Sequence, residues 1–284
     1  MRIHYLNCIS TCPLGGGLMD GYSGMRLRGR LTCTCLLLET SAGLVLVDTG
    51  FGLRDIASPR TRLSRFFLAL LKPEFREEMT AIRQLQRLGF EPTDVRHILL
   101  THLDFDHAGG LDDFPHATVH MMADERNYAL AQITWLDRQR FRPQQWSTRD
   151  KWQVYAPGGE AWYGFDSVRD LKGLPPEILM VPLRGHTFGH AGIAIESEQG
   201  WLLNAGDAYF FHGEMDPERP HCTPGLRLYQ QFMEKDRAAR LQNQTRLRAL
   251  RRRHPTSVNL MCSHDGHDFE SLAGRSATQA VPTV

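Results

Sequence analysis

The sequence lacks the features that mark membrane-spanning, secreted and nucleic-acid-binding proteins. Nowhere do about eighteen apolar residues follow one another, and the opening stretch MRIHYLNCIS has no apolar core behind a basic start. The 33 lysine and arginine residues nearly balance the 32 aspartate and glutamate residues, so the formal charge is +1. No excess of one charge favours nucleic acid or an anionic membrane as a partner. We therefore expect a soluble cytoplasmic protein that acts on a small molecule.

Cysteine is also scarce, with six residues in the chain. None of them forms the C-x-x-C pairs of a structural zinc module. We expect reduced and mostly buried thiols. Cys33 and Cys35 alternate along a predicted strand and should share one of its faces.

A linker rich in proline, glycine or serine is missing as well, so the 284 residues are expected to form a single domain over residues 1–270. The last residues, 271–284, are expected to form a flexible tail.

Apolar patterning divides the chain into strands and helices. Strand-like runs occur at RIHYLNCI, LTCTCLLLET, LVLVDTG, VRHILLT, ATVHMM, EILMVPL, HAGIAIES, GWLLNAGD and SVNLMCSH. Apolar residues recur every three or four positions between residues 60 and 90, which predicts helices there. Another helix is predicted from Thr223, as N-cap, through Pro224 to the basic stretch LRRRH.

Two segments carry more apolar or aromatic side chains than one covered face requires. The segment 123–174 is polar, weak in strand pattern and rich in aromatic residues, which suggests a helical insertion covering a pocket. Residues 65–71, RFFLALL, fit a dimer interface, a lid, or a helix covered on two sides.

Histidine and aspartate gather where five of the apolar runs end. Asp48 follows LVLV, the cluster His102 to His107 follows HILLT, His186 follows MVPLRG, Asp207 follows WLLNAG and His264 follows NLMCS. Imidazole and carboxylate groups in such density suit a divalent cation. Because chemistry in open sheets commonly lies at the C-terminal ends of strands, we expect these residues to meet in one metal centre.

The stretches THLDFDHAGG, GHTFGHAG, NAGDAYF and SHDGH together resemble the metallo-β-lactamase superfamily, with its His-x-His-x-Asp-His, Gly-His-Thr, Gly-Asp and late His motifs. The layout looks most like the acyl-homoserine lactone lactonases. This resemblance implies an α/β fold of four layers, an αβ/βα sandwich of two central mixed sheets with helices outside.

Carried over residue by residue, the resemblance implies a dinuclear site. His102, Asp104 and His186 would hold the first metal, Asp106, His107 and His264 the second, and Asp207 would bridge them. Asp48 would orient a ligand by hydrogen bonding. Two divalent ions are implied, with zinc favoured and iron or manganese as alternatives.

Asp104 stands where the superfamily usually has a histidine. A carboxylate adds a negative charge and a harder oxygen ligand, which moves preference from zinc towards iron or manganese. The alternative is that the aspartate is too short to reach the metal, so that the second site is occupied alone.

Two residues are candidate catalytic groups. Asp106 would carry a proton from the attacking water to the leaving group, and Tyr209 would donate to the developing oxyanion, although lactonases have their tyrosine three residues after the bridging aspartate. His190, His212 and His267 are interpreted as structural.

The resemblance implies hydrolysis of a small, uncharged ester or lactone with an apolar part. Thioesters, phosphoesters and a non-hydrolytic iron-binding redox role remain alternatives, and a homodimer is compatible with the sequence.

Overall fold

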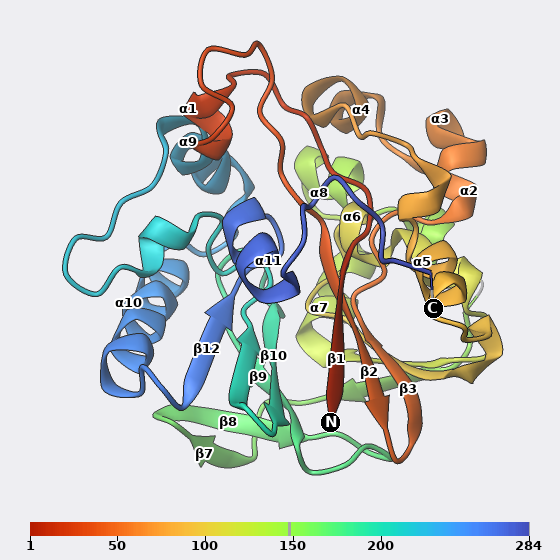
Figure 1. Ribbon diagram of the computed structural model, residues 1–284, viewed down its shortest axis with the longest axis vertical. Coiled ribbons are helices and arrows are strands. Elements are labelled where there is room, and N and C mark those ends of the chain that lie inside the picture. The colour runs from red at the N-terminus through yellow and green to blue at the C-terminus, as the bar shows by residue number, and fades with distance from the viewer. Residues whose placement is uncertain (147–148, 284) are drawn as a thin grey trace.

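Two β-sheets lie face to face in the computed structural model, which describes residues 1–146 and 149–283 (Figure 1). The first sheet has six strands in the order β1-β2-β3-β4-β5-β6. Its β1, β2 and β3 pair antiparallel, and β3 to β6 pair parallel. Its strands are β1 (Arg2–Asn7), β2 (Thr34–Thr40), β3 (Gly43–Val47), β4 (Val95–Leu99), β5 (Thr118–Met122) and β6 (Trp152–Tyr155).

The second sheet also has six strands, in the order β12-β11-β10-β9-β8-β7. All its neighbours pair antiparallel except β11 and β12, which are parallel. Its strands are β7 (Glu160–Trp162), β8 (Phe165–Asp170), β9 (Ile178–Pro182), β10 (Ala191–Ser197), β11 (Gly200–Asn204) and β12 (Val258–Met261).

Helices cover the outer faces of both sheets and the edge where the strands end. The α-helices are α1 (Gly17–Asp20), α2 (Leu53–Ala57), α3 (Pro59–Arg62), α4 (Arg65–Leu71), α5 (Ala81–Arg87), α6 (Phe105–Ala108), α7 (Ala123–Ala131), α8 (Trp135–Arg140), α9 (Pro224–Met233), α10 (Arg237–Arg253) and α11 (Gly266–Ala273). Short 3₁₀ helices are η1 (Glu77–Met79), η2 (Pro92–Asp94), η3 (Gly109–Asp113), η4 (Pro143–Gln145) and η5 (His212–Met215). Within the described residues, no helix is long and apolar enough to cross a membrane.

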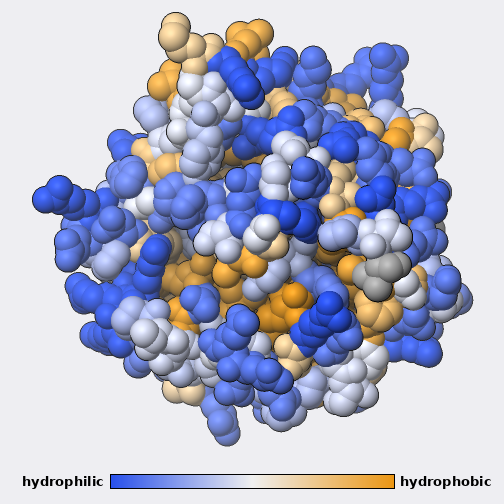
Figure 2. Space-filling model, viewed as in Figure 1, coloured by the Kyte–Doolittle hydropathy of each residue, from blue (hydrophilic) through white to orange (hydrophobic). Residues whose placement is uncertain are grey.

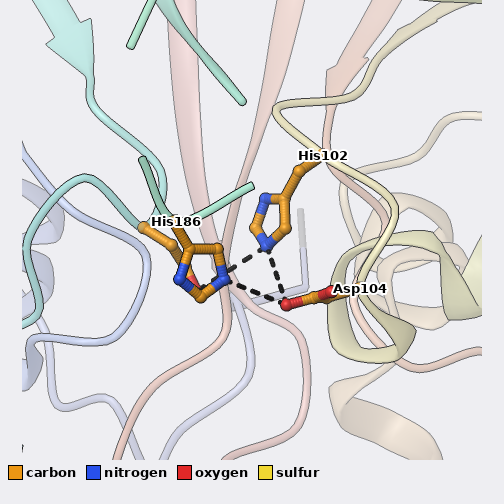
Figure 3. Close-up of side chains that lie close together, drawn as sticks. His102, Asp104 and His186 are labelled. Carbon is orange, nitrogen blue, oxygen red and sulfur yellow. Dashed lines mark hydrogen bonds and ion pairs between the residues drawn. The ribbon is translucent and has the colours of Figure 1, made fainter. Parts of the chain in front are cut away.

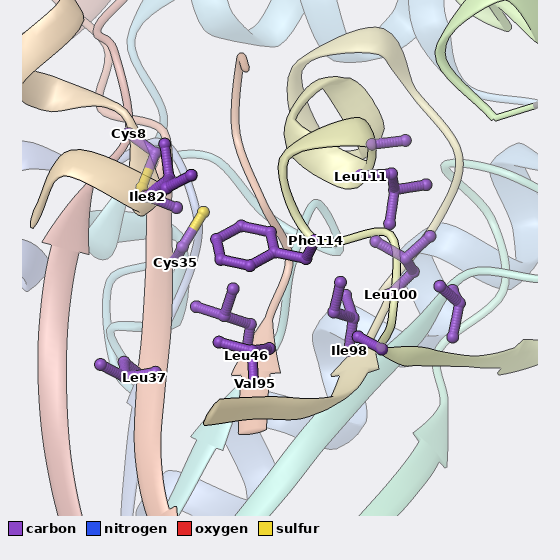
Figure 4. Close-up of a cluster of buried hydrophobic side chains, with 14 of the residues drawn as sticks. Cys8, Cys35, Leu37, Leu46, Ile82, Val95, Ile98, Leu100, Leu111 and Phe114 are labelled. Atoms are coloured by element: carbon purple, nitrogen blue, oxygen red, sulfur yellow. The ribbon is translucent and has the colours of Figure 1, made fainter. Parts of the chain in front are cut away.

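Alternation along the strands explains the layers, because successive side chains point to opposite faces. In β2, Cys35 and Leu37 pack outwards against α5, where Ile82 and Leu85 meet them (Figure 4). Their neighbours Leu36 and Leu38 point inwards into the core between the two sheets. The second sheet packs outwards onto α10 in the same way. The predicted four-layer fold is confirmed.

The segment 123–174 is helical in its first part and forms strands in its second. It supplies α7 and α8 and then the strands β6, β7 and β8, so it adds to both sheets instead of forming a helical cover. The strands β6 and β7 are short, partly exposed edge strands, which explains why the strand pattern is weak there. Ser147 and Thr148 of this segment lie outside the described residues.

The helix predicted from Thr223 to the basic stretch is two helices. Thr223 does cap α9, since its side chain accepts from the backbone N–H of Leu226. Asp236 then caps α10 by accepting from Ala239. Between the helices, the N–H groups of Lys235 and Asp236 both donate to the carbonyl of Gly185, at 2.8 and 3.0 Å. The break therefore fixes the loop that carries His186.

The segment 271–284 packs against the first sheet where it is described, unlike the flexible tail expected from sequence. Residues 271–273 end α11. The carbonyl of Ala277 accepts from Asn7, and the N–H of Val281 donates to Gln84. Val281 is 4% exposed and belongs to the core beneath α5. Val284 lies outside the described residues.

Residues 65–71 form α4, which is covered on two sides. Phe67 and Leu71 are buried in an apolar cluster, and Phe66 contacts Trp135 of α8 and Phe232 of α9. Of the three interpretations of this stretch, these contacts favour the helix covered on two sides.

Candidate metal centre

The five strand ends meet at one edge of the two sheets. The strands β3 and β4 are parallel, as are β11 and β12, so the loops that follow them leave on the same side. The loop after β9 joins them, because β9 and β11 both run antiparallel to β10. The seven side chains predicted as metal ligands are thereby brought together, and each is at most 6% exposed.

Asp207 lies at the middle of this cluster. Its Oδ2 is 3.2 Å from His264 Nε2, 3.4 Å from His186 Nε2 and 3.7 Å from His102 Nε2. Its Oδ1 is 3.3 Å from His107 Nε2. One carboxylate thus faces four imidazole nitrogens.

Potential ligand atoms fall into two groups around Asp207. One group contains His102, Asp104, His186 and Asp207, and the other contains Asp106, His107 and His264. Figure 3 shows His102, Asp104 and His186 of the first group. Asp104 Oδ2 lies 3.0 Å from His186 Nε2 and 3.4 Å from His102 Nε2. The carboxylate of Asp104 therefore reaches the ligand cluster.

Three of the histidines have their Nδ1 atoms fixed by partners outside the cluster. His107 Nδ1 lies 2.9 Å from Asp48 Oδ2, His264 Nδ1 lies 2.6 Å from the carbonyl of Thr32, and His102 Nδ1 lies 2.9 Å from Thr101 Oγ1. These contacts turn each Nε2 towards the centre. Asp48 adopts a positive φ of 56° directly after β3, a strained conformation for this residue type that points its carboxylate at His107.

The cluster leaves atoms that a cation would satisfy. Within the described residues, His102 Nε2 and Asp207 Oδ1 are buried and take part in no hydrogen bond. Buried polar atoms are usually paired, and imidazole nitrogens with carboxylate oxygens form the ligand set of zinc and similar ions. The residues present therefore fit a divalent cation. His102 Nε2 belongs to the first group, and Asp207 Oδ1 faces His107 of the second.

At His107 and Asp207, the summed charges of neighbouring groups outweigh burial. At His102 and His186, burial prevails and lowers the pKa. Burial alone would lower the pKa of His107, but the charges of Asp207 and Asp48 raise it well above its usual value. Burial would likewise raise the pKa of Asp207, yet the surrounding histidines hold it well below its usual value. Asp207 therefore stays ionised, and its negative charge favours positively charged groups nearby.

Arg140 is a charged partner that the sequence did not reveal. Its Nε lies 2.6 Å from Asp104 Oδ1, and its Nη2 lies 2.5 Å from Asp104 Oδ2 and 2.8 Å from His186 Nε2. Burial alone would raise the pKa of Asp104, but Arg140 and His102 hold it well below its usual value. The negative charge expected to draw harder metals to Asp104 is therefore already balanced by the protein.

Tyr209 does not point at the ligands. Its hydroxyl donates to Asp268 at 3.1 Å, and its ring belongs to the core beneath α10. Phe210 takes the place beside the metal ligands, with its ring stacked on His264 at 5.1 Å. The ring of Tyr229, from α9, packs edge-on against Phe210.

Tyr229 is a second residue that sequence reasoning missed. Burial raises the pKa of its hydroxyl well above the usual value, and the charges of Asp106, Asp104 and Asp207 raise it further. Tyr229 therefore keeps its proton, and its ring lies against Phe210 beside the predicted ligands. It lies in a helix far along the chain from every motif, so no local pattern could have indicated it.

Three further histidines, His190, His212 and His267, contact residues around the candidate site. His190 bonds the backbone of Asp207 and of Leu183. His212 lies 2.9 Å from Asp265 and is stacked with His267. These contacts agree with the structural interpretation of all three.

Aromatic residues of the segment 123–174 enter the cores rather than the site. Trp146 is buried beneath α5 and Trp162 beneath α10, whereas Trp135 is 52% exposed. From this segment, Arg140 of α8 contacts the predicted ligands. The apolar neighbours come from residues 20–31, from Phe210 after β11 and from α9. Tyr22, Leu31, Phe210 and Leu226 surround a gap beside His264 that is too narrow for a water molecule.

Comparisons with known proteins agree with this geometry. The sequence profile of the metallo-beta-lactamase superfamily matches residues 28–259. A Mycobacterium tuberculosis protein named "Probable metallo-hydrolase" is 38% identical over 278 residues, which are 98% of this chain and 84% of that protein. An N-acyl homoserine lactonase of Bacillus thuringiensis is 28% identical over 187 residues, 66% of this chain and 67% of that protein.

Solved structures share the fold at lower identity. An N-acyl homoserine lactone hydrolase with bound N-hexanoyl-L-homoserine superimposes with a TM-score of 0.70 at 22% identity, covering 98% of both chains. AidC, a dizinc quorum-quenching lactonase, gives 0.58 at 17% identity and covers 93% of this chain and 89% of its own. The chain belongs to the metallo-beta-lactamase superfamily and is one of its metallo-hydrolases.

Proposed function

We propose that the protein hydrolyses small esters or lactones that carry an apolar part, using two divalent cations. The observation that carries this proposal is the position of Asp207, whose two oxygens face the histidines of both ligand groups. The named lactonases among the relatives support a carboxylic ester as the substrate class.

Bound cations would supply a Lewis acid for the substrate carbonyl and would lower the pKa of a water molecule. His102, Asp104, His186 and Asp207 would hold one cation, and Asp106, His107, His264 and Asp207 the other. The relative named as a dizinc lactonase and the four imidazole ligands favour zinc. Because Arg140 balances the charge of Asp104, the case for iron or manganese is weakened.

Two residues would move protons in this reaction. Asp106 is the most exposed of the seven cluster residues, at 6%, and burial raises the pKa of its carboxyl. It can therefore accept a proton near the cluster and pass it to a leaving alkoxide. Tyr229 would donate to the developing oxyanion in place of Tyr209.

An apolar substrate part is supported by the segment that lies over the site. Leu14, Leu18, Tyr22, Met25 and Leu27 are all more than half exposed, and Figure 2 shows hydrophobic side chains at the top of the molecule, above α1. Exposed apolar side chains gathered on one segment commonly mark a binding surface. A cavity of about 920 Å³ lies far from the ligands, at the other end of β11.

The test combines metal analysis with a substrate panel. Protein purified without added metal is analysed for bound metals and then assayed with lactones, esters, thioesters and phosphodiesters. We expect lactone or ester turnover that chelation abolishes and zinc restores. The Asp207→Ala variant should lose metal and activity together. Turnover of thioesters or phosphodiesters alone would overturn the substrate class, and bound iron without any turnover would favour the redox alternative.

A further inference from the structure

We propose that the guanidinium of Arg140 competes with a divalent cation for Asp104 and His186, so that the two metal positions fill with unequal affinity. The position at Asp106, His107 and His264 fills first, and the other fills when Arg140 moves aside. This inference concerns metal loading, and it holds whether or not the substrate is an ester.

Arg140 contacts the two atoms that a metal at the first position would need. Its Nη2 lies 2.5 Å from Asp104 Oδ2 and 2.8 Å from His186 Nε2. A metal bound to both atoms would lie about 2.0–2.2 Å from each. A cation and Nη2 cannot share that position, because both would face the same lone pairs.

Contacts with several other elements hold Arg140 against Asp104. Arg140 is fully buried, and its Nη1 donates to the carbonyl of Met233 at 2.7 Å, at the end of α9. Its helix α8 is fixed at the other end by Asp137, which pairs with Lys235 and accepts from Tyr128. The backbone of Asp104 pairs with Phe141, the residue after Arg140. Arg140 is therefore held against Asp104 from both sides.

The carboxylates of the cluster differ in their positively charged partners. Asp104, Asp106 and Asp207 bring three carboxylates to the cluster, and Arg140 returns one positive charge to Asp104 alone. In the described part of the chain, Asp106 and Asp207 pair with histidines but with no lysine or arginine. Among the described residues, Asp106 of the second group therefore has no guanidinium or ammonium partner, whereas a cation bound to Asp104 must displace the guanidinium of Arg140.

Removing Arg140 from its pair with Asp104 should raise the metal affinity of the first position. A buried carboxylate left without its partner is costly, and a bound divalent ion relieves that cost. Removing the charge of Arg140 should therefore strengthen binding at the first position by about tenfold or more. The same substitution should leave the metal affinity of the second position unaltered.

The experiment measures stepwise metal binding, with Co²⁺ as the probe and absorbance and magnetic coupling as readouts. The wild-type protein should bind one Co²⁺ tightly and a second at least about tenfold more weakly, with coupling between ions appearing at the second equivalent. In Arg140→Met, the two ions should bind with similar affinity. Arg138→Met, on the exposed face of the same helix, is the control and should match the wild type.

Two further measurements keep the proposal falsifiable if Arg140→Met folds poorly. The double variant Asp104→His with Arg140→Met restores the superfamily ligand set without a buried charge, and it should bind two ions of similar affinity. The wild type alone is also decisive. Two equally tight ions in the wild type, or first-position affinity unchanged in a folded Arg140→Met, would overturn the proposal.

Discussion

His190 accepts a hydrogen bond from the backbone N–H of Asp207, with 2.9 Å between Nε2 and N. Its Nδ1 lies 2.9 Å from the carbonyl of Leu183, to which it donates. The imidazole thus ties the loop after β11 to the end of β9, and it holds the residue that faces both ligand groups.

Replacing His190 should loosen the metal centre without removing a ligand. In His190→Ala, the amide of Asp207 loses its partner and the carboxylate can turn away from the histidines, so metal affinity should fall about tenfold or more. Competition with a chromogenic chelator measures this. The matched control is His212→Ala, which removes a histidine bonded to Asp265 at the rim. Unchanged affinity in His190→Ala would show that Asp207 is held by other contacts.

The two tyrosines near the site should behave differently when each loses its hydroxyl. Tyr229→Phe should lower kcat by about tenfold or more, with little change in metal content, because the hydroxyl proposed to donate to the oxyanion is lost. Tyr209→Phe removes a hydrogen bond to Asp268 and should cost about 1 kcal/mol of stability, with kcat nearly unchanged. A larger kcat loss in Tyr209→Phe than in Tyr229→Phe would restore the original prediction for Tyr209.

Acid should destabilise the protein through His120. Burial and the nearby His97 lower the pKa of His120 to about 3, while the unfolded chain titrates near pH 6.5. The unfolded state therefore binds more protons between these values, so stability is present above about pH 6.5 and falls as the pH drops towards 3. At pH 5, the loss of unfolding free energy from this one histidine amounts to about 2 kcal/mol.

Denaturant unfolding at pH 5 and pH 8 checks this prediction. The loss of stability at pH 5 should be about 2 kcal/mol smaller in His120→Asn than in the wild type. Exposed His116, replaced by Asn, serves as the control. Equal pH dependence in all three proteins would contradict the prediction.

Opening the narrow gap beside His264 should change which acyl chains are accepted. Leu226→Ala removes apolar volume from its wall, so kcat/KM for longer acyl chains should rise relative to short ones, by up to about 0.8 kcal/mol for each methylene that becomes buried. Leu250→Ala is the matched control, because Leu250 is equally buried but packs beneath α10. Both variants should lose about 2–5 kcal/mol of stability. An unchanged chain-length profile in Leu226→Ala would mean that the acyl part lies elsewhere.

The sequence by itself determined the strands and the gathering of the ligands, and the family resemblance implied the sandwich of two sheets. Alternation in stretches such as LTCTCLLLET has a period of two, which is the geometry of a strand. Histidine and aspartate after five apolar runs must meet if the strands end at one edge, and Asp207 does face both groups. These are local signals, and each lies within a few residues of the strand that it follows.

Only the tertiary structure decided what surrounds the ligands. Arg140 pairs with Asp104 across 36 residues of chain, and Tyr229 packs against Phe210 beside the predicted ligands from a helix with no motif. The helix break at Lys235 and Asp236 exists because their N–H groups bond Gly185, where a side chain would meet the backbone of Arg240 within 2.5 Å. Partners so distant in sequence are brought together by packing, and packing leaves no periodic pattern in the chain.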